Sequence, residues 1–456
     1  MTSRSKSRST SKAAERGRSP KSATRGRASK TAERERPEVA IADLCGFLDA
    51  SPTPHHVVAT AAKKLLDAGF TWFDAASELP DFAGRATKGF VTRGGALVAF
   101  ATSQSANDKF RIVGAHTDSP GLHLKSNPEG LAANFGTLEV EVYGSPLLNS
   151  WLDRDLDIAG HVVRRNGQVV MFRSATPVAR LAQLAIHLDR GVNESGLILD
   201  KHAHLRPVWT TGQDVLPVRA VAAHLAGVDL KDVAAVHAQL VDHEPARVIG
   251  ADASLLASGR LDNQLSCWAA VDAMSKVAGN DGVAVVALFD HEEVGSDSTT
   301  GAGGPLLEHL LERIAASLGK SRGEYLTMLP KSACLSCDNA HAVHPNYQER
   351  HDHKHAPFIN SGVALKTNSN QRYATSASSA VSFLSACTAA GVDHQTFFSR
   401  NNMPCGSTIG PITATRLGID TVDVGVPQLS MHSAREVCGV NDAVDLPKIA
   451  RAFLRG

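Results

Sequence analysis

The stretch GVAVVALF at residues 282–289 decides the fold, and DHEE follows it at once at residues 290–293. A continuous apolar run rich in β-branched residues is typical of a central parallel strand that is buried on both faces. Helical periodicity flanks this run, over Leu265–Ala278 before it and Leu306–Leu318 after it. The alternation predicts a three-layer α/β/α domain with a central, mostly parallel sheet, which binds its ligands at the carboxyl ends of the strands.

The same alternation continues toward both ends of the chain. We expect further helices at Ile41–Ala50, Val57–Ala68 and Ala377–Ala390, and further strands at Gly95–Ala101, Arg111–Ala115 and Thr421–Val426. These elements assign residues 37–129 and 243–456 to one α/β domain.

Residues 130–242 have a different character, because strand patterns replace the helices. Thr137–Tyr143 alternates apolar and polar residues, as a half-buried strand does. Ile158–Val163 and Gln168–Phe172 flank Asn166-Gly167, which is a strong signal for a β-hairpin. We expect an inserted β-rich domain at residues 130–242.

Charge is distributed unevenly along the 456 residues. The net charge is +1, yet residues 1–36 carry twelve Lys or Arg and three Glu, so the other 420 residues carry −8. The folded body therefore offers no general nucleic-acid-binding charge. The polar tail at 1–36 is predicted to be disordered. It is either a plain solvated extension or a contact for nucleic acid or an anionic membrane.

The sequence also indicates a cellular compartment. No apolar region follows the basic start, and the longest apolar run, around Val283–Phe289, is far too short to span a bilayer. The seven cysteines are odd in number and scattered, which argues against a disulfide framework. We therefore expect a cytoplasmic protein with no membrane partner.

Two strands end in clusters of metal-binding residue types. Residues 112–115 lead into His116-Thr117-Asp118, as residues 285–289 lead into Asp290-His291-Glu292-Glu293. Imidazole and carboxylate groups suit zinc, cobalt and manganese. His116 is a candidate metal ligand, and Asp118 is the carboxylate that would orient its ring. Side chains of adjacent glutamates diverge, so one can bind metal while the other faces a bound water as general base.

Three further segments supply candidate ligands, namely Asp262, Asp338 and His432. Taken alone, each feature has an ordinary explanation, since paired glutamates are usually solvated and an Asp before a helix is commonly an N-cap. Together they supply two histidines and enough carboxylates for a two-metal site.

Several ordered motifs resemble one known family. They are GAHTDSP (114–120), WLDRDL (151–156), AIHL (185–188), RLDN (260–263), EEVGS (292–296), HAVHPNY (341–347), QRYA (371–374), PCG (404–406) and MHS (431–433). The chain resembles the aspartyl aminopeptidase family of two-metal exopeptidases over roughly residues 40–456. The resemblance implies a metal-dependent aminopeptidase that releases acidic residues from peptides.

Residue roles follow from this resemblance, position by position. Asp262 would bridge two divalent ions, zinc or else cobalt or manganese. His116 and Asp338 would complete one metal position, and Glu293 and His432 the other. Glu292 would be the general base, with Asp118 orienting His116.

The resemblance further implies an assembly and a substrate pocket. The insertion would be a dimerisation domain, the assembly a dodecamer built from dimers, and His187 would reach a neighbouring active site. Lys366, Tyr373 and His341 would line the pocket for an acidic side chain, since a Lys pairs with a carboxylate. Two alternatives remain open: an aminopeptidase that prefers neutral residues, and a non-catalytic assembly or nucleic-acid-binding protein acting through the tail.

Three segments depart from the family pattern. His291 stands where the family usually has Asn, the loop at 121–125 around His123 differs from the animal members, and residues 362–365 precede Lys366 in place of the usual Gly-Pro. These departures put fine substrate preference in doubt and leave the predicted metal ligands intact.

Overall fold

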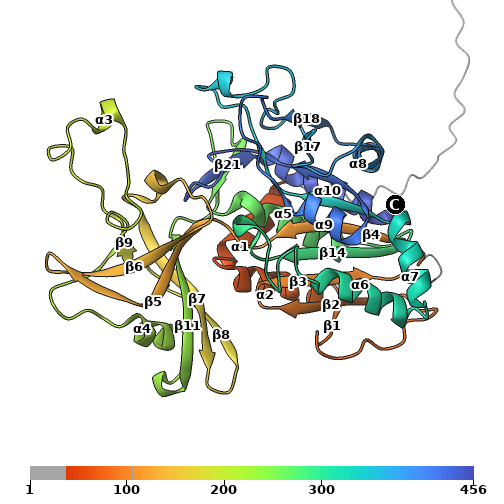
Figure 1. Cartoon of the computed structure of the whole chain (residues 1–456), viewed down its shortest axis with the longest axis horizontal. Helices are drawn as coiled ribbons and strands as arrows, with labels where there is room; N and C mark the ends of the chain where they lie inside the picture. Colours follow the sequence, from red (N-terminus) through yellow and green to blue (C-terminus); the bar gives the residue numbers. More distant parts are fainter. Residues whose placement is uncertain (1–36, 105–106) are drawn as a thin grey trace, which may run out of the picture. The chain divides into compact units, whose positions relative to one another are not determined.

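Strand β14 (Val283–Phe289) lies inside a nine-stranded sheet of the computed structural model, which describes residues 37–104 and 107–456 (Figure 1). It pairs in parallel with β4 (Phe110–His116), and β4 pairs in parallel with β15 (Ala333–Cys337). On its other side β14 pairs antiparallel with β3 (Ala96–Ala101). The tail at 1–36, predicted to be disordered, lies outside the described residues.

The remaining strands of this sheet make it mixed. Its order is β1-β2-β3-β14-β4-β15-β19-β17-β18, in which β2–β3, β3–β14 and β17–β19 are antiparallel and the other pairs parallel. The strands not yet described are β1 (Thr71–Trp72), β2 (Lys88–Arg93), β17 (Val363–Thr367), β18 (His394–Phe398) and β19 (Asp420–Gly425). The predicted α/β fold with a mostly parallel central sheet is confirmed.

Both faces of β14 are buried because its side chains alternate between two hydrophobic cores. Ala284, Val286 and Leu288 belong to the core on one face, and their neighbours Val285 and Ala287 to the core on the other. This is the physical basis of the continuous apolar run, since neither face of the strand meets water.

Helices cover both faces of the sheet and complete the three layers (Figure 1). One face packs α1 (Pro37–Ala50), α2 (Pro54–Asp67), α5 (Leu261–Ser275), α8 (Ala377–Ala390) and α10 (Val440–Arg455). The other packs α6 (Leu306–Ser317), α7 (Arg322–Met328) and α9 (Ile409–Leu417). Helix α5 begins four residues before the predicted Leu265, at Leu261, and Asp262 in its first turn has a non-helical ψ of 105°. Among the described helices, none has the length and hydropathy that a bilayer crossing requires.

The insertion forms a β-barrel with its own core. Strand β11 pairs with both β5 and β7, which closes the ring β11-β5-β6-β10-β9-β7, and β8 extends it beside β7. The strands are β5 (Gly121–Ala132), β6 (Phe135–Tyr143), β7 (Asp155–Arg164), β8 (Val169–Arg173), β9 (Ala179–Arg180), β10 (Val208–Thr211) and β11 (Val233–Asp242). Helix α4 (Val218–Leu225) packs on the core of the barrel, and the short helix α3 (Val192–Ser195) lies in the loop after β9. The inserted β-rich unit is confirmed, whereas its boundaries at 130 and 242 stay a prediction.

The predicted hairpin is present between β7 and β8. Gly167 has a positive φ of 85°, and its N–H donates to the Arg164 carbonyl at 2.8 Å. Glycine adopts this left-handed backbone at no steric cost, so the Asn-Gly pair can turn the chain tightly.

A smaller sheet of five strands, among the described residues, joins segments that are far apart in the chain. Its order is β12 (Arg247–Ile249), β13 (Leu255–Ser258), β21 (Glu436–Gly439), β20 (Pro427–Leu429) and β16 (Ala340–His341). It brings the segment between β20 and β21, with His432, next to the start of α5.

Candidate metal centre

Three neighbouring parallel strands place candidate ligands at one edge of the central sheet. His116 is the last residue of β4, Glu292 and Glu293 lie in a single 3-10 turn after β14, and Asp338 follows β15. The predicted meeting of the two strand-end clusters is therefore confirmed by the parallel pairing of β4 with β14. Asp262 and His432 reach the same place from α5 and from the smaller sheet.

The candidate ligands form two trios that share Asp262. In the first, His116 Nε2 lies 3.6 Å from Asp262 Oδ1 and 3.8 Å from Asp338 Oδ1. In the second, His432 Nε2 lies 3.4 Å from both Asp262 Oδ2 and Glu293 Oε2. Within each trio the candidate ligand atoms lie within 4.8 Å of one another. Each oxygen of Asp262 faces a different trio, as a bridging carboxylate requires.

The chemistry of this donor set fits divalent metal ions. Ligand atoms around one tetrahedral zinc lie roughly 3.3–3.6 Å apart, close to the separations seen here. Asp262 Oδ1 and Glu293 Oε1 are buried and find no hydrogen-bond partner among the described residues. Burial, with the charge of Asp262 close by, raises the pKa of Glu293 well above its usual range. Such crowding of carboxylates is relieved when a cation binds between them.

Both histidine rings are held so that Nε2 faces the carboxylates. His116 Nδ1 lies 3.1 Å from the main-chain oxygen of Asp118, and His432 Nδ1 lies 3.1 Å from that of Ser145. A carbonyl only accepts, so Nδ1 must carry the proton in each ring and Nε2 is left free to bind.

Asp118 does more than orient His116. Its Oδ1 lies 3.3 Å from His116 Nδ1 and accepts the main-chain N–H of Glu292 at 3.0 Å. Its Oδ2 accepts the N–H of Glu293 at 3.1 Å and the Tyr143 hydroxyl at 2.7 Å. One buried carboxylate therefore fixes a ligand and the turn that carries both glutamates.

Glu436 has a matching position beside the second trio, and sequence reasoning missed it. Its carboxylate accepts the N–H of Asp262 at 2.9 Å and the N–H of His432 at 2.7 Å. Burial raises the pKa of Glu436 to about 8, with the charge of Asp262 adding to the rise. Tyr143 was missed as well, because its contact with Asp118 depends on the pairing of β5 with β6.

Glu292 is placed as a general base would be. Its Oε2 lies 4.0 Å from His116 Nε2, and its side chain is 16% exposed, to the cavity beside the trios. Burial raises the pKa of Glu292 to about 7, and the neighbouring carboxylates contribute to the rise. A base with a pKa near neutrality both accepts and returns a proton readily.

A cavity of about 290 Å³ lies on one side of Asp118, and a larger one of about 550 Å³ opens over the trios. The larger cavity is lined by the predicted pocket residues His341, Lys366 and Tyr373. Lys366 is buried, and its ammonium donates to the main-chain oxygens of Asp338 at 2.9 Å and Asn339 at 3.0 Å. It also lies 4.8 Å from the centre of the Tyr373 ring.

Arg372 lines the same cavity and had no role in the sequence prediction. Its side chain is exposed, and the guanidinium makes no ion pair within the described part of the chain. The signal that could have found it is its position beside Tyr373 in the QRYA motif.

His187 lies apart from this cavity in its own chain. It sits in an exposed turn after β9, between the exposed apolar residues Ile186 (47%) and Leu188 (74%). The structure thus brings ten of the eleven predicted site residues to the metal centre and its cavity, and His187 is the exception.

The chain is similar to known proteins over most of its length. Residues 47–454 match the family model described as aminopeptidase I zinc metalloprotease (M18). A relative from Streptomyces coelicolor, described as a probable M18 family aminopeptidase 2, is 47% identical over 91% of this chain and 97% of its own.

Solved structures agree with this match. The aminopeptidase 1 dodecamer of Saccharomyces superposes with a TM-score of 0.80, at 26% identity, over 91% of this chain and 96% of that one. An M18 aminopeptidase from Thermotoga maritima has the same fold, with a TM-score of 0.81 at 23% identity over 93% of this chain and 98% of that one. The chain therefore belongs to the M18 family of zinc metalloproteases, and it is a metalloaminopeptidase that hydrolyses peptide bonds.

Proposed function

We propose that this aminopeptidase uses two divalent metal ions, most simply zinc, to release N-terminal Asp and Glu residues from peptides. The observation that carries the two-ion proposal is the sharing of Asp262, whose two oxygens face separate trios. His116 and Asp338 would complete one position, and Glu293 and His432 the other. When bound, the metal ions supply Lewis acidity that polarises the scissile carbonyl and lowers the pKa of the attacking water.

Glu292 would act as the general base. Its carboxylate would take a proton from the attacking water and return it to the leaving amine. A bound cation would lower the pKa of Glu292 from the value of about 7 that it has in the crowded carboxylate cluster, so the base would be ionised at neutral pH. Asp118 would keep the His116 ring and the Glu292 main chain in place during this proton transfer.

The preference for acidic substrates is supported by the cations of the larger cavity. Lys366 and Arg372 both line it, beside Tyr373 and His341. A substrate carboxylate between these groups would gain charge-assisted hydrogen bonds that a neutral side chain cannot make. Lys366 already donates to protein oxygens, so it would share its protons with the substrate, whereas Arg372 is uncommitted.

The assembly is the second part of the proposal. The Saccharomyces relative is a dodecamer, and we propose the same assembly for this chain, built from dimers through the barrel. The exposed apolar side chains around His187 suit burial against another copy. His187 of one copy would then reach the substrate in the cavity of its neighbour.

The compartment and the tail also belong to the proposal. The seven cysteines are free thiols, which supports the predicted cytoplasmic location. Membership of the M18 family speaks against a non-catalytic protein. A nucleic-acid contact through the tail concerns residues that the structure does not describe.

One assay tests metal and substrate together. Hydrolysis of Asp-, Glu- and Leu-anilides is measured before and after chelation, with zinc, cobalt or manganese added back. We expect chelation to abolish activity, re-addition to restore it, and Asp and Glu to exceed Leu. A higher rate on Leu would support the neutral-residue alternative instead.

Two variants separate the cations of the cavity. Arg372→Met should reduce the preference for Asp over Leu by about 10-fold. This is the effect expected when the substrate carboxylate loses one ion pair that is only partly shielded from water. Lys366→Met should reduce the same preference and also weaken metal binding, because Lys366 touches Asp338. An unchanged preference in both variants would contradict the acidic-substrate proposal.

A further inference from the structure

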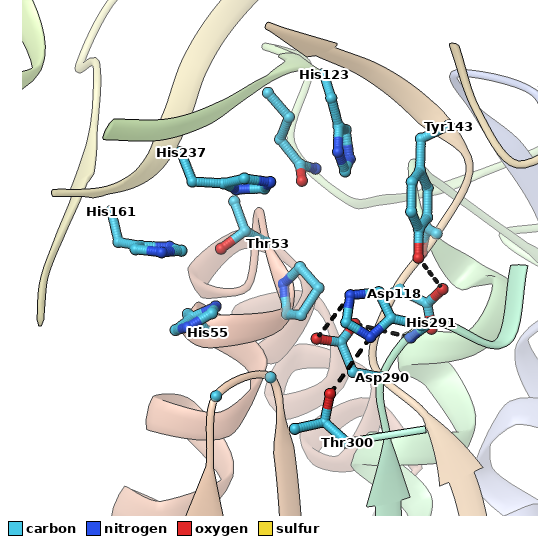
Figure 2. A pocket seen from close by; sticks show the side chains of 15 residues that line it. Thr53, His55, Asp118, His123, Tyr143, His161, His237, Asp290, His291 and Thr300 are labelled. Atoms are coloured by element: carbon cyan, nitrogen blue, oxygen red, sulfur yellow. Dashed lines mark hydrogen bonds and ion pairs between the residues drawn. The ribbon is translucent and has the colours of Figure 1, made fainter. Parts of the chain in front are cut away.

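A second cavity, of about 290 Å³, lies between the barrel and the α/β domain and is lined by histidines (Figure 2). It shares no lining residue with the larger cavity over the metal trios. We call it the histidine cleft and define it by His55, His123, His161 and His237. His291, Asp118 and Asp290 lie on its other wall.

Strand pairing puts three of these histidines on one face of the barrel. His161 of β7 stands directly opposite His237 of β11, and His123 of β5 stands opposite Gln239, two residues further along β11. Since strand side chains alternate with a period of two, these rings share a face, while Ala238 and Leu240 point into the barrel core. Opposed and diagonal neighbours on one face are within reach of long side chains.

The fourth ring comes from the first turn of α2 and completes a continuous row. The ring centres of His55 and His161 are 4.0 Å apart, those of His161 and His237 5.3 Å, and those of His237 and His123 5.3 Å. Figure 2 shows the four rings gathered around the same opening, opposite Asp118 and His291. Four separate segments of the chain thus converge on one cavity.

None of these four rings makes a hydrogen bond to another residue in the described ranges 37–104 and 107–456. Eight ring nitrogens therefore face the cleft or solvent with no protein partner. His55, His123 and His161 are half-buried and His237 is exposed, so the cleft is open to a ligand from solvent. Several unpaired imidazoles side by side favour a ligand that uses more than one of them at once.

We propose that the histidine cleft binds one divalent transition-metal ion, in addition to the ions of the catalytic centre. Neutral imidazole is the ligand that zinc, nickel and copper prefer among side chains of this kind. Burial and the neighbouring rings lower the pKa of His123 and His161 to about 3, so both rings are neutral at physiological pH. Asp118 and Asp290 add negative charge at the wall of the cleft.

Binding requires the rings to turn. In the described residues, three candidate ligand atoms lie within 4.8 Å of one another only at the catalytic centre, so the cleft closes around an ion by rotation about the side-chain χ angles. Ring centres about 5 Å apart suit this closure, because imidazoles on one tetrahedral ion have centres roughly that far apart.

Two of the three departures from the family pattern meet at this cleft, because His123 and His291 both line it. These two departures, which the metal centre did not explain, therefore lie at one site in the fold.

A short path of contacts connects the cleft to the catalytic centre. The His123 ring stacks on Tyr143 at 4.4 Å with an angle of 7° between the planes. The Tyr143 hydroxyl donates to Asp118 (Figure 2). Asp118 in turn holds His116 and the Glu292 main chain. A metal ion that draws His123 away from Tyr143 would loosen this path, so an excess of the ion should slow catalysis.

Nickel binding to the zinc-loaded full-length enzyme tests the proposal directly, with no need for substrate. Isothermal titration and metal analysis should find one nickel ion per subunit beyond the zinc already present. His161→Gln combined with His237→Gln removes two ligands and should weaken nickel binding by at least about 10-fold, and more if both bind directly. His224→Gln, an exposed histidine on α4 of the same barrel, should bind nickel as the unaltered enzyme does.

The result is interpretable even if the double variant is unstable. His55→Gln changes only the half-buried first turn of α2 and should also weaken binding by about 10-fold. Absence of an extra nickel ion in the unaltered enzyme, or equal nickel binding by the unaltered enzyme, the double variant and His55→Gln, would overturn the proposal. Neither outcome bears on the substrate preference proposed above, because zinc content and peptide hydrolysis are measured separately.

Discussion

Two groups of histidines lie on opposite sides of Asp118, and they differ in what holds their rings. His116 and His432 each have Nδ1 fixed by a main-chain carbonyl at 3.1 Å, so Nε2 points at carboxylates. The rings of the histidine cleft have no hydrogen bond to the described protein, and they pack against one another and, at His123, against Tyr143. The catalytic centre is thus built in advance for a cation, whereas the cleft has to adjust. Preorganised ligands with fixed partners bind metal more tightly.

The largest effect should come from Asp262→Asn, because this residue alone serves both trios. The amide keeps the shape of the side chain but loses the charge and one of the two acceptor oxygens. We expect both metal positions to weaken by more than about 100-fold and hydrolysis to be lost. Metal analysis after dialysis measures the first effect and an anilide assay the second. Asp214→Asn, an exposed aspartate of the barrel, is the matched control. Full occupancy of both positions in Asp262→Asn would refute bridging.

Glu292→Gln separates the base from the ligands in the same centre. Loss of a general base reduces turnover by about 10²–10⁴-fold. Metal content should stay near normal, because Glu292 is not needed to complete either trio that shares Asp262. Glu194→Gln, exposed in the barrel loop, should behave as the unaltered enzyme. Near-full turnover in Glu292→Gln would remove the base assignment, and loss of metal would make Glu292 a ligand.

Sequence patterns predicted the centre because its residues stand next to buried strands. The apolar run at 283–289 predicted that Glu292 and Glu293 follow the end of a buried strand. The shorter apolar run before His116 predicted the same position for His116. Parallel pairing of adjacent strands then brings their ends together without further information. Local patterns of this kind need no knowledge of tertiary contacts.

The supporting residues could not be found in this way. Arg435-Glu436 resembles an exposed charge pair in the sequence, and only the pairing of β21 with β13 and β20 buries the glutamate beside Asp262. The histidine cleft likewise depends on the register of β7 against β11, which sets His161 opposite His237. Register is a property of the folded sheet and is invisible to a search along one strand.

Glu436→Gln measures how much this support contributes. The carboxylate accepts main-chain N–H groups with both oxygens, and a glutamine offers only one acceptor. We expect metal affinity to fall by about 10–100-fold, mainly at the position of Glu293 and His432. Competition with a chelator measures the affinity, and KM should change little once metal is in excess. An unchanged affinity would mean that Asp262 and His432 are positioned by packing alone.

The smallest expected effect is the dependence of stability on pH in the chelated enzyme. It distinguishes the catalytic centre from the histidine cleft most directly. Burial and nearby carboxylates raise the pKa of Glu436 to about 8 and of Glu292 to about 7, and their carboxylate neighbours raise that of His432 to about 10. A raised pKa means that the folded state holds protons that the unfolded state has released. The stability that the two glutamates contribute is therefore lost as pH rises from about 4.5 to 8, and that of His432 as pH rises from about 6.5 to 10.

The cleft should respond in the opposite direction. Burial lowers the pKa of His161 and His123 to about 3, so their contribution is complete above the unfolded value near 6.5 and is lost as pH falls toward 3. The two opposite trends offset each other between about pH 4.5 and 6.5, so thermal unfolding of the chelated enzyme should show a broad maximum of Tm there, with a fall of a few degrees on each side. Zinc should remove the alkaline fall, since a cation replaces the protons of the catalytic centre. His161→Gln with His237→Gln should remove part of the acid fall and leave the alkaline one. A single change that altered both sides equally would show that the two regions titrate as one.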